Sequence, residues 1–317
     1  ARSRQCILHI CRQDKFIPPF IDLIEESFDP KDHLFWIKGL ETHTIPNKAN
    51  NIFYMEKSMF GQLKGYLHLI FLMVMAEKII LHSLLSSKVT FLLFIMRWLL
   101  KKSYWVMWGS DLYAFKAAKK SLSSKLWEGI RHSVISNIGH LVTYIPGDFE
   151  SARKWYRAKG TYHECFMYTS NTINKYVKNL AYIRQENFFQ PSILLGNSGD
   201  PSNEHLEMLK ILHQNFETLS KIIAPLSYGK ASYRMKIRKK GFEYFGEKFN
   251  PLDQLMDYED YIRLLSEVDI ALFNHKRQQA MGTTITLLAL GKTIYLRPDT
   301  NQWRFLAGLG VGVKNIN

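Results

Sequence analysis

Cysteine, long apolar runs and acidic side chains are all scarce in this chain of 317 residues. Its three cysteines, Cys6, Cys11 and Cys165, cannot build a disulfide framework, and no CxxC or Cys/His cluster indicates structural zinc. This cysteine usage fits a reducing, cytosolic setting. The apolar run at 67–76 contains His68, and the run at 89–100 contains Arg97. Both are shorter than the roughly 20 residues needed to span a bilayer.

The two ends of the chain also lack expected features. The basic N-terminus is followed by an apolar stretch at residues 7–10 only, which is too short for the core of a signal peptide. The chain does not begin with Met, and it ends soon after the last predicted strand, with no closing helix predicted. We therefore expect that residues are missing at one or both ends.

Acidic residues are outnumbered, with 28 Asp and Glu against 42 Lys and Arg, and the formal charge is +14. Residues 101–160 carry eleven basic and four acidic side chains, so 11 − 4 = +7, half of the excess, lies there among several tryptophans. Basic and aromatic residues together fit the headgroups of an anionic membrane. They fit a solvated helix face over a tryptophan-containing core equally well. They also fit RNA, although no RRM, KH or zinc-knuckle signature is present.

Apolar strands alternate with helices in the first half of the chain. Strands are predicted at 6–11, 33–37, 78–82, 104–108 and 141–145, and helices at 60–76, 87–100 and 121–137. Apolar strands separated by helices predict a parallel sheet that is covered on both faces. Residues 160–190 have no clean periodicity and are predicted to be a connector.

A second α/β run begins at Pro191. Strands are predicted at 193–195, 221–225, 242–245, 269–274 and 293–296, and helices at 201–216, 233–240, 258–268 and 281–290, with Gly241 and Gly291 as helix stops. The chain is therefore predicted to hold two Rossmann-like domains, at 1–160 and 191–317, joined by a connector at 161–190. Two such domains whose parallel sheets face a cleft form the GT-B layout. Periodicity alone does not separate it from other two-domain α/β proteins, such as periplasmic binding proteins.

The loop at 196–205 (GNSGDPSNEH) connects a predicted strand to a helix, at the sheet edge where ligands bind in open α/β folds. Gly196 and Gly199 permit a tight turn, and Asp200 before Pro201 is typical of a helix cap. The free N–H groups of such a turn can hold a phosphate. A capped turn with no ligand explains the same residues equally well.

The loop at 273–284 (FNHKRQQAMGTT) brings positive side chains to a helix that begins near Gly282. Arg277 offers a planar fork for a phosphate, and Thr283 and Thr284 add hydroxyl groups at the amino end of the helix. We predict a diphosphate site here, with a solvated loop as the alternative. The spacing GxxxxGK[ST] of a P-loop is absent.

The loop at 108–113 (WGSDLY) follows a strand of the first half. A carboxylate at Asp111 can accept a proton from an attacking hydroxyl group if it faces the cleft. Taken alone, an N-cap or Asx turn is the better explanation. Asp14, which follows the first predicted strand, marks a position where an acceptor site can lie. No HExxH, HxH or Ser/His/Asp arrangement is present.

Three segments together resemble one family. These are ILLGNSGDPSNEH at 193–205, RQQAMGT at 277–283 and WGSDLY at 108–113. They are similar to the TDP-N-acetylfucosamine:lipid II N-acetylfucosaminyltransferases, glycosyltransferase family 56, which make enterobacterial common antigen. The similarity is dense over 191–305 and sparse over 1–190. The stretch PLSYG at 225–229 also resembles this family, whereas Met281 and residues 274–276 depart from its pattern.

The resemblance implies a metal-independent GT-B glycosyltransferase without a cofactor. The second domain would bind a nucleoside diphosphate sugar, and the first would bind an undecaprenyl-diphosphate-linked saccharide at the cytoplasmic face of the inner membrane. Carried over residue by residue, it implies three groups of site residues. Asp111 would be the catalytic base if configuration inverts, or would orient the acceptor if it is retained. Trp108, Gly109 and Asp14 would contact the acceptor. The donor would be contacted by Asn197, Ser198, Gly199, Asp200, Tyr228, Arg277, Gln278, Gly282, Thr283 and Thr284.

The sparse match over 1–190 leaves the acceptor and the exact deoxy-amino sugar open, because the first half reads the acceptor. Two other functions also remain open. One is a non-catalytic protein that binds sugar nucleotides, and the other is an RNA-binding protein in which phosphate contacts explain the charge of +14.

Overall fold

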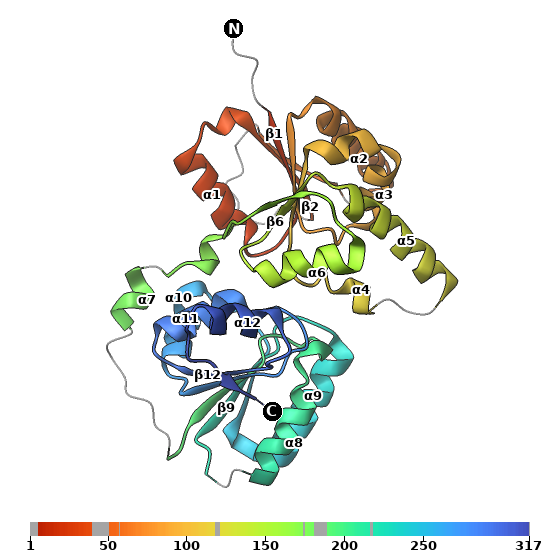
Figure 1. Ribbon diagram of the computed structural model, residues 1–317. Helices are drawn as coiled ribbons and strands as arrows, with labels where there is room; N and C mark the ends of the chain where they lie inside the picture. Colours follow the sequence, from red (N-terminus) through yellow and green to blue (C-terminus); the bar gives the residue numbers. More distant parts are fainter. Residues whose placement is uncertain are drawn as a thin grey trace. The chain divides into compact units, whose positions relative to one another are not determined.

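The computed structural model describes residues 6–39, 51–56, 58–117, 121–173, 175–180, 189–215 and 218–316 (Figure 1). The chain divides into two compact units, unit 1 (Ala1–Thr169) and unit 2 (Ser170–Asn317). Several residues used above lie outside the described parts. They include Lys119 and Lys120, two of the eleven basic residues counted at 101–160, and Phe216, the predicted last residue of the helix at 201–216.

Unit 1 is built on a seven-stranded parallel sheet in the order β3-β2-β1-β4-β5-β6-β7. Its central strands are rich in Ile, Leu, Trp and Val, and buried residues lie on both of their faces, as expected for a parallel sheet. The strands are β1 (Ile7–Arg12), β2 (His33–Lys38), β3 (Ile52–Tyr54), β4 (Lys78–His82), β5 (Ser103–Val106), β6 (His140–Val142) and β7 (Thr161–His163).

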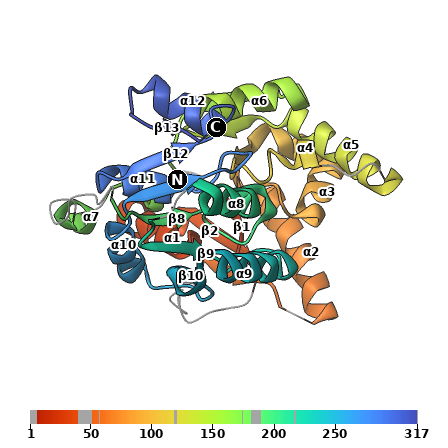
Figure 2. The same ribbon diagram turned by 90° about the horizontal axis from the view of Figure 1, so that it is seen from below.

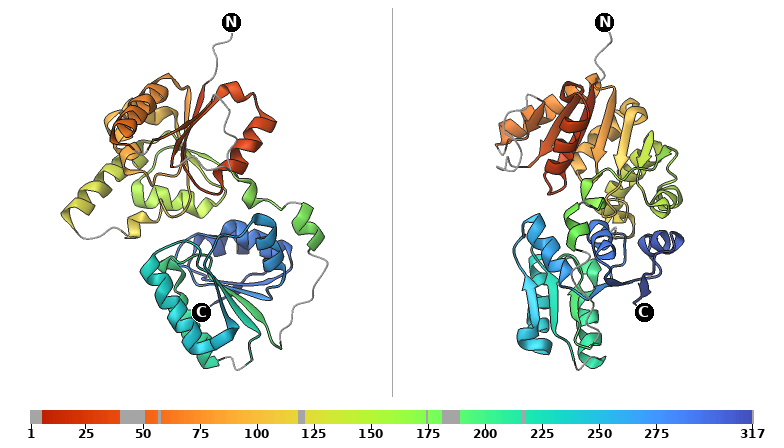
Figure 3. Two further views of the ribbon diagram at one scale, coloured as in Figure 1. Left: turned by 180° about the vertical axis from the view of Figure 1, so that it is seen from behind. Right: turned by 90° about the vertical axis from the view of Figure 1, so that its left-hand side faces the viewer.

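Helices cover both faces of this sheet (Figures 1 and 3). Helix α1 (Ile17–Ser27) packs on one face through Ile17, Phe20, Ile21 and Ile24, which recur at helical spacing. The opposite face carries α2 (Met59–Met75), α3 (Ser87–Ile95), α5 (Leu122–Asn137) and α6 (Pro146–Tyr156). Short elements complete the unit, namely α4 (Ala114–Ala117) and the 3-10 helices η1 (Pro30–Asp32) and η2 (Arg97–Lys102).

Unit 2 holds a six-stranded parallel sheet in the order β10-β9-β8-β11-β12-β13. The strands are β8 (Ser192–Leu195), β9 (Lys221–Pro225), β10 (Phe249–Leu252), β11 (Ile270–Phe273), β12 (Thr293–Leu296) and β13 (Lys314–Asn315). Helices α8 (His205–Asn215) and α9 (Ala231–Phe245) lie side by side over one apolar core (Figure 2). A second core lies under α7 (Lys175–Leu180), α10 (Tyr258–Ser266), α11 (Met281–Ala289) and α12 (Asn301–Gly308). Three 3-10 helices remain, η3 (Thr169–Asn171), η4 (Pro201–Asn203) and η5 (Gly246–Lys248).

The two predicted α/β sheets are confirmed, but several local features differ from the prediction. Helix α9 continues through Gly241, and the strand predicted at 242–245 is wrong, because these residues end the helix and the strand is β10. The region 161–190, predicted to be a connector, contributes β7 to the first sheet and α7 to unit 2. Helix α12, which was not predicted, follows β12. Helix α1 was also missed, because two prolines at its start obscure the pattern.

The strand order reverses beside the first strand of each sheet. In unit 1 the reversal lies between β1 and β4, and in unit 2 it lies between β8 and β11. The loops that leave two such strands run to opposite faces of the sheet, so a crevice forms at their carboxyl ends, where open α/β proteins bind ligands.

Among the described residues, no helix combines the length and apolar character needed to cross a membrane.

Gly241 allows a direct test of the packing of α9 on β10. A Cβ atom at Gly241 would lie 2.4 Å from the ring of Phe249, whereas a Cβ atom at Gly129, inside α5, would meet nothing within 4 Å. Ala favours a helix over Gly by about 1 kcal/mol, but overpacking costs about 1–3 kcal/mol. We therefore expect Gly241→Ala to lower the Tm by about 2–6 °C, and the matched Gly129→Ala to leave it unchanged or raise it. Equal Tm shifts for both variants would contradict this packing.

Candidate functional site

The loops that follow β8, β9 and β11 border the strand reversal of unit 2, the position at which an open parallel sheet leaves a crevice. The loop after β8 is bound to the loop after β9, because Gly199 N–H donates to the Tyr228 carbonyl and Lys230 N–H donates to the Gly199 carbonyl, at 2.7 and 3.0 Å. A Cβ atom at Gly229, where φ is 117°, would lie 2.4 Å from the Gly199 carbonyl. Glycine is therefore required for this close approach of two backbones.

Asn203 holds the loop after β8 from the inside. Its amide nitrogen donates to the carbonyl oxygens of Ser198 and Asp200 at 3.1 and 3.2 Å, and its amide oxygen accepts from Asn197 N–H at 3.2 Å. The side chain is 1 % exposed, so these contacts satisfy a buried amide that would otherwise be costly. One buried side chain thus fixes three of the predicted donor residues.

A second amide connects this loop to the loop after β11. Gln279 donates to the Asn197 side-chain oxygen at 3.1 Å and accepts from the Ser202 hydroxyl at 3.1 Å. Gln302, from α12, accepts from Gln279 N–H and donates to the Thr284 hydroxyl at 2.9 Å. The structure therefore brings the two predicted loops together through buried amides.

The amino end of α11 lies at this crevice, and no side chain caps it. Ala280 precedes it with φ of 58°, and the first N–H groups of any helix lack partners within that helix. Arg277 lies beside the helix start, and its guanidinium is 3.8 Å from the Asp200 carboxylate. Burial raises the pKa of Asp200, but hydrogen bonds from Ser202 and the charge of Arg277 outweigh it, so the pKa lies below its ordinary value. The free N–H groups and a guanidinium form a setting for an anion.

The remaining predicted donor residues divide into two groups. Tyr228 is exposed, Gln278 and Thr283 are half-buried, and the Thr283 hydroxyl lies 3.5 Å from the hydroxyl of Tyr261. In contrast, Thr284 is fully buried, and its hydroxyl donates to the Ala280 carbonyl while it accepts from Gln302. A Cβ atom at Gly282 would lie 2.6 Å from the Ser170 carbonyl. Thr284 therefore supports the helix start rather than a ligand, and Gly282 is required for close packing.

Two buried histidines lie behind the same loops. A Cβ atom at Gly196 would lie 2.4 Å from the His205 ring, and His275 Nδ1 pairs with the Arg277 carbonyl at 3.0 Å. Burial lowers the pKa of His205 to about 4 and that of His275 to about 3. Both imidazoles are therefore neutral near pH 7, and they add no charge to the crevice.

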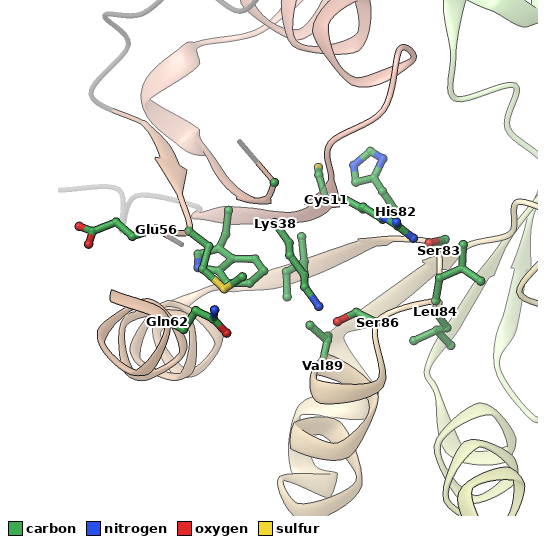
Figure 4. Close-up of a pocket in the computed structure, with 15 residues that line it drawn as sticks. Cys11, Lys38, Glu56, Gln62, His82, Ser83, Leu84, Ser86 and Val89 are labelled. Atoms are coloured by element: carbon green, nitrogen blue, oxygen red, sulfur yellow. The ribbon is translucent and has the colours of Figure 1, made fainter. Parts of the chain in front are cut away.

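Unit 1 contains a cavity of about 470 Å³ at its own point of strand reversal (Figure 4). It is lined by the carboxyl ends of β1, β2 and β4 and by the amino ends of α2 and α3. Its polar walls include Arg12, Lys38, Gln62, Ser83 and Ser86. None of the predicted acceptor residues lines it.

The cavity carries an excess of positive charge. Burial lowers the pKa of Lys38, and the nearby charges of Lys88 and Arg12 lower it further. Among the residues that the structure describes, no ion pair joins Arg12 or Lys38 to an acidic side chain. Glu56 also lines the cavity, but Figure 4 shows its carboxylate pointing away from the Lys38 amine. These positive groups indicate a binding place for an anion.

Asp111 does not face solvent, which corrects the prediction of a catalytic base. Its side chain is 0 % exposed, and both carboxylate oxygens are occupied. One oxygen accepts from Trp108 N–H and Leu112 N–H, both at 3.0 Å, and the other accepts from Leu84 N–H at 2.9 Å and from the Trp105 indole at 2.7 Å. A carboxylate with four donors holds its loop and is not placed to take a proton from a substrate.

The contacts of Asp111 position a wall of the cavity. Leu84 belongs to the segment Ser83–Ser86 that lines the cavity, and Arg131 of α5 donates both to the Leu84 carbonyl and to the Asp111 carbonyl. Ser83 has φ of 79°, which is uncommon for a residue other than glycine. The Asp111 and Arg131 contacts hold the segment that contains this strained residue.

Trp108 begins a buried hydrogen-bonded chain that reaches the cavity. Its indole N–H donates to the Tyr168 hydroxyl at 2.8 Å, and that hydroxyl is hydrogen-bonded to His82 Nδ1 at 2.6 Å. His82 Nε2 is in turn hydrogen-bonded to His9 Nδ1 at 3.1 Å, and His9 Nε2 to His33 Nδ1 at 2.9 Å. Burial lowers the pKa of His82 to about 3 and that of His9 well below its ordinary value, which keeps these rings neutral.

The other acceptor predictions lie near this chain. Asp14 is half-buried, and burial raises its pKa, although the Phe16 N–H bond opposes this. Phe16 contacts the rings of both Trp108 and Tyr168. Gly109 has φ of 76° and makes the turn before Asp111. These residues form a cluster at the carboxyl edge of unit 1.

Among the described residues, no group of three or more His, Cys, Asp or Glu side chains could hold a metal ion.

Comparison with known protein families shows to which family the chain belongs. Residues 73–313 match the model of the 4-alpha-L-fucosyltransferases, glycosyl transferase group 56. The chain belongs to this family. It is therefore a glycosyltransferase that depends on a nucleotide sugar, as predicted.

Solved structures confirm the predicted GT-B fold of this transferase. An E. coli protein described as trehalose-6-phosphate bound with UDP-2-fluoro glucose is 10% identical, with a TM-score of 0.60 over 97% of this chain and 88% of that chain. Anabaena HepE in complex with UDP is also 10% identical, with a TM-score of 0.62 over 94% and 82%. WaaG, a glycosyltransferase involved in lipopolysaccharide biosynthesis, is 10% identical, with a TM-score of 0.60 over 96% and 84%. At this identity the likeness shows the fold alone.

Sequence reasoning missed several residues that shape the cavity of unit 1 and hold together the loops of unit 2. Asn203 and Gln279 lie inside the quoted motifs, so the motifs marked them without indicating that they are buried. Lys38 closes the second predicted strand together with Gly39, which is a signal for a loop at the carboxyl edge. Gln302 and Arg131 carry no local signal, because their roles depend on contacts with distant segments.

Asp111→Asn tests the structural role of this carboxylate in the transferase. An amide cannot accept four N–H bonds, and its NH₂ group would face donors, so we expect a stability loss of about 2–3 kcal/mol and a lower Tm. The matched control is Asp29→Asn, because Asp29 is exposed and accepts one N–H bond from Lys31. A loss of kcat with an unchanged Tm would instead support a catalytic base.

Proposed function

We propose that this glycosyltransferase moves a 4-acetamido-4,6-dideoxygalactose-like sugar from a TDP donor to an undecaprenyl-diphosphate-linked saccharide. The product would serve surface polysaccharide synthesis of the enterobacterial common antigen type. Membership of the fucosyltransferase family supports a deoxy sugar as the group that is transferred. The motifs shared with the N-acetylfucosaminyltransferases support the finer choice of donor and acceptor.

The observation that carries the donor site is the uncapped start of α11 beside Arg277, at the strand reversal of the second sheet. A diphosphate placed there would accept bonds from the helix N–H groups and from the guanidinium. To do so, Arg277 would turn from Asp200 toward the ligand, and at 3.8 Å their contact is long. Tyr228 and Thr283 border the same place with groups that suit a nucleotide or a sugar.

The chemistry of transfer explains why such a site is needed. The oxygen of an acceptor hydroxyl forms a bond to the anomeric carbon, the bond from that carbon to the diphosphate breaks, and the hydroxyl proton leaves to a base or to solvent. Negative charge grows on the departing TDP. N–H groups and a guanidinium that are already in position stabilise this charge without reorganising. The amides of Gln279 and Asn203 would keep the loops in that position.

For the acceptor, the cavity of unit 1 supports an anionic group. Arg12 and Lys38 would bind the diphosphate of the lipid-linked saccharide, since the cavity holds positive groups that no described acidic residue pairs with. Asp111 would act through the wall of this cavity rather than on the reacting atoms. This acceptor would place the enzyme at the cytoplasmic face of the inner membrane.

Arg277→Gln tests the donor site. With TDP-sugar and lipid-linked acceptor, we expect kcat to fall about 10²–10³-fold, because a donor aimed at the leaving group is lost. TDP binding, measured by calorimetry, should also weaken. Arg263→Gln is the matched control, because its guanidinium pairs with Asp260 on the surface of α10. Transfer by Arg277→Gln at the wild-type rate would contradict the assignment, and no transfer from any sugar nucleotide by the wild type would overturn the function.

Lys38→Gln tests the acceptor site independently. Loss of one charge-assisted contact is worth about 1.5–3 kcal/mol, so we expect the KM for the lipid-linked acceptor to rise tenfold or more. The KM for the donor should stay unchanged. Lys31→Gln, which removes a charge from an exposed 3-10 helix of the same unit, should change neither KM. An equal rise of both KM values would argue against an acceptor site in this cavity.

A further inference from the structure

The outer face of α2 is unusually apolar. Apart from Lys64, its large exposed side chains are apolar and recur at helical spacing, namely Met59, Phe60, Leu63, Leu67, Phe71, Val74 and Met75. Phe60 is 84% exposed and Phe71 is 60% exposed. The opposite side of the helix packs on the sheet through Leu69, Leu72 and Met73. Helix α2 is therefore apolar on nearly all sides, although only one side meets the core.

The apolar face continues onto α3 and η2. Phe91, Ile95 and Trp98 follow at spacings of four and three residues, and Trp98 is 64% exposed. Two lysines show that this segment lies beside α2, as Figure 3 also shows. Lys88 lies 3.5 Å from Gln62 of α2, and Lys102 donates to the Val74 carbonyl at 3.0 Å. We call the exposed apolar residues of these elements the α2–α3 surface.

Charge around the α2–α3 surface has almost one sign. Residues 58–110 contain one acidic residue, Glu77. They contain six basic residues, which are Lys64, Lys78, Lys88, Arg97, Lys101 and Lys102. Lys64, Arg97 and Lys101 are exposed. A second copy of the same face would bring these like charges together, which disfavours self-association. An anionic surface with an apolar interior matches both the charges and the apolar side chains.

We infer that the α2–α3 surface docks this transferase onto an anionic phospholipid membrane, with its apolar side chains among the acyl chains and its basic residues among the headgroups. This location differs from residues 101–160, whose basic and aromatic residues fitted a membrane surface and a solvated helix face over a core equally well. Trp105 of that region is fully buried in the core, whereas Trp98 is exposed. The tryptophans that looked interfacial there are therefore partly core residues.

The cavity of unit 1 is lined in part by the same two helices. Gln62 at the start of α2 and Val89 at the start of α3 both line the cavity. A lipid anion could thus enter the cavity while its hydrocarbon chain remains in the bilayer that the α2–α3 surface contacts. This link to the acceptor rests on the proposed function, whereas docking itself depends only on the surface.

Vesicle binding of the full chain tests the inference. We compare co-sedimentation with vesicles of phosphatidylcholine alone and of phosphatidylcholine mixed with phosphatidylglycerol. The wild type should bind the mixed vesicles more tightly, and salt should weaken this binding. The triple variant Leu63→Gln, Leu67→Gln, Phe71→Gln should lower binding about tenfold or more, because three apolar anchors are lost.

A charge variant and a control variant separate the contribution of the basic residues to vesicle binding from that of exposed apolar side chains elsewhere. Arg97→Gln with Lys101→Gln should lower binding to the mixed vesicles and reduce its salt dependence. Met235→Gln with Phe242→Gln is the matched control, since these residues on α9 are 66% and 46% exposed outside the proposed surface. The control should bind like the wild type. Unfolding curves should show that every variant remains folded.

The outcomes also separate docking from sugar transfer. Vesicle binding by the triple variant at the wild-type level would overturn the inference. A wild type that binds no vesicles, but dimerises in solution through this surface, would overturn it as well. Transfer to a short-chain, water-soluble acceptor should persist in the triple variant, while transfer to acceptor in vesicles should fall. If no acceptor is used but the triple variant still loses vesicle binding, docking stands and the proposed function fails.

Discussion

Every strand in both sheets runs parallel, and this constraint decides where the transferase can bind its ligands. Parallel neighbours need crossover connections, and these are nearly always right-handed. When the order of strands reverses, the connections on either side of the reversal go to opposite faces and leave a crevice at the carboxyl ends. The cavity in unit 1 lies at the β1–β4 reversal, and the loops of Asn197 and Arg277 lie at the β8–β11 reversal.

Both crevices are kept in shape by buried polar side chains. Asp111 and Arg131 hold one wall of the cavity, and Asn203, Gln279 and Gln302 join the loops of unit 2. Leaving such a group without a partner costs about 1–3 kcal/mol, so each network resists rearrangement. Rigid loops suit catalysis by preorganised donors, because little reorganisation is needed as charge develops on a leaving group.

The positively charged side chains lie at different kinds of places in the two units. In unit 1, Lys38 and Arg12 face a cavity, while Lys64, Arg97 and Lys101 accompany the exposed apolar side chains of the α2–α3 surface. In unit 2, Lys276 pairs with Glu204, and Arg277, four residues before the start of α11, lies 3.8 Å from Asp200. The proposed transfer from a nucleotide sugar to a lipid-linked saccharide would use both places, because one substrate would come from water and the other from a membrane.

The sequence by itself determined most strands, the parallel sheets and the two loops of unit 2, because apolar periodicity and turn residues act locally. Only the tertiary structure decided three other features. Helix α9 passes through Gly241 because the ring of Phe249 fills the space of a Cβ atom. Asp111 is buried because donors from three separate segments converge on it, and Thr284 is buried because Gln302 reaches it from α12. Such roles depend on which distant residues become neighbours, and no local pattern encodes that.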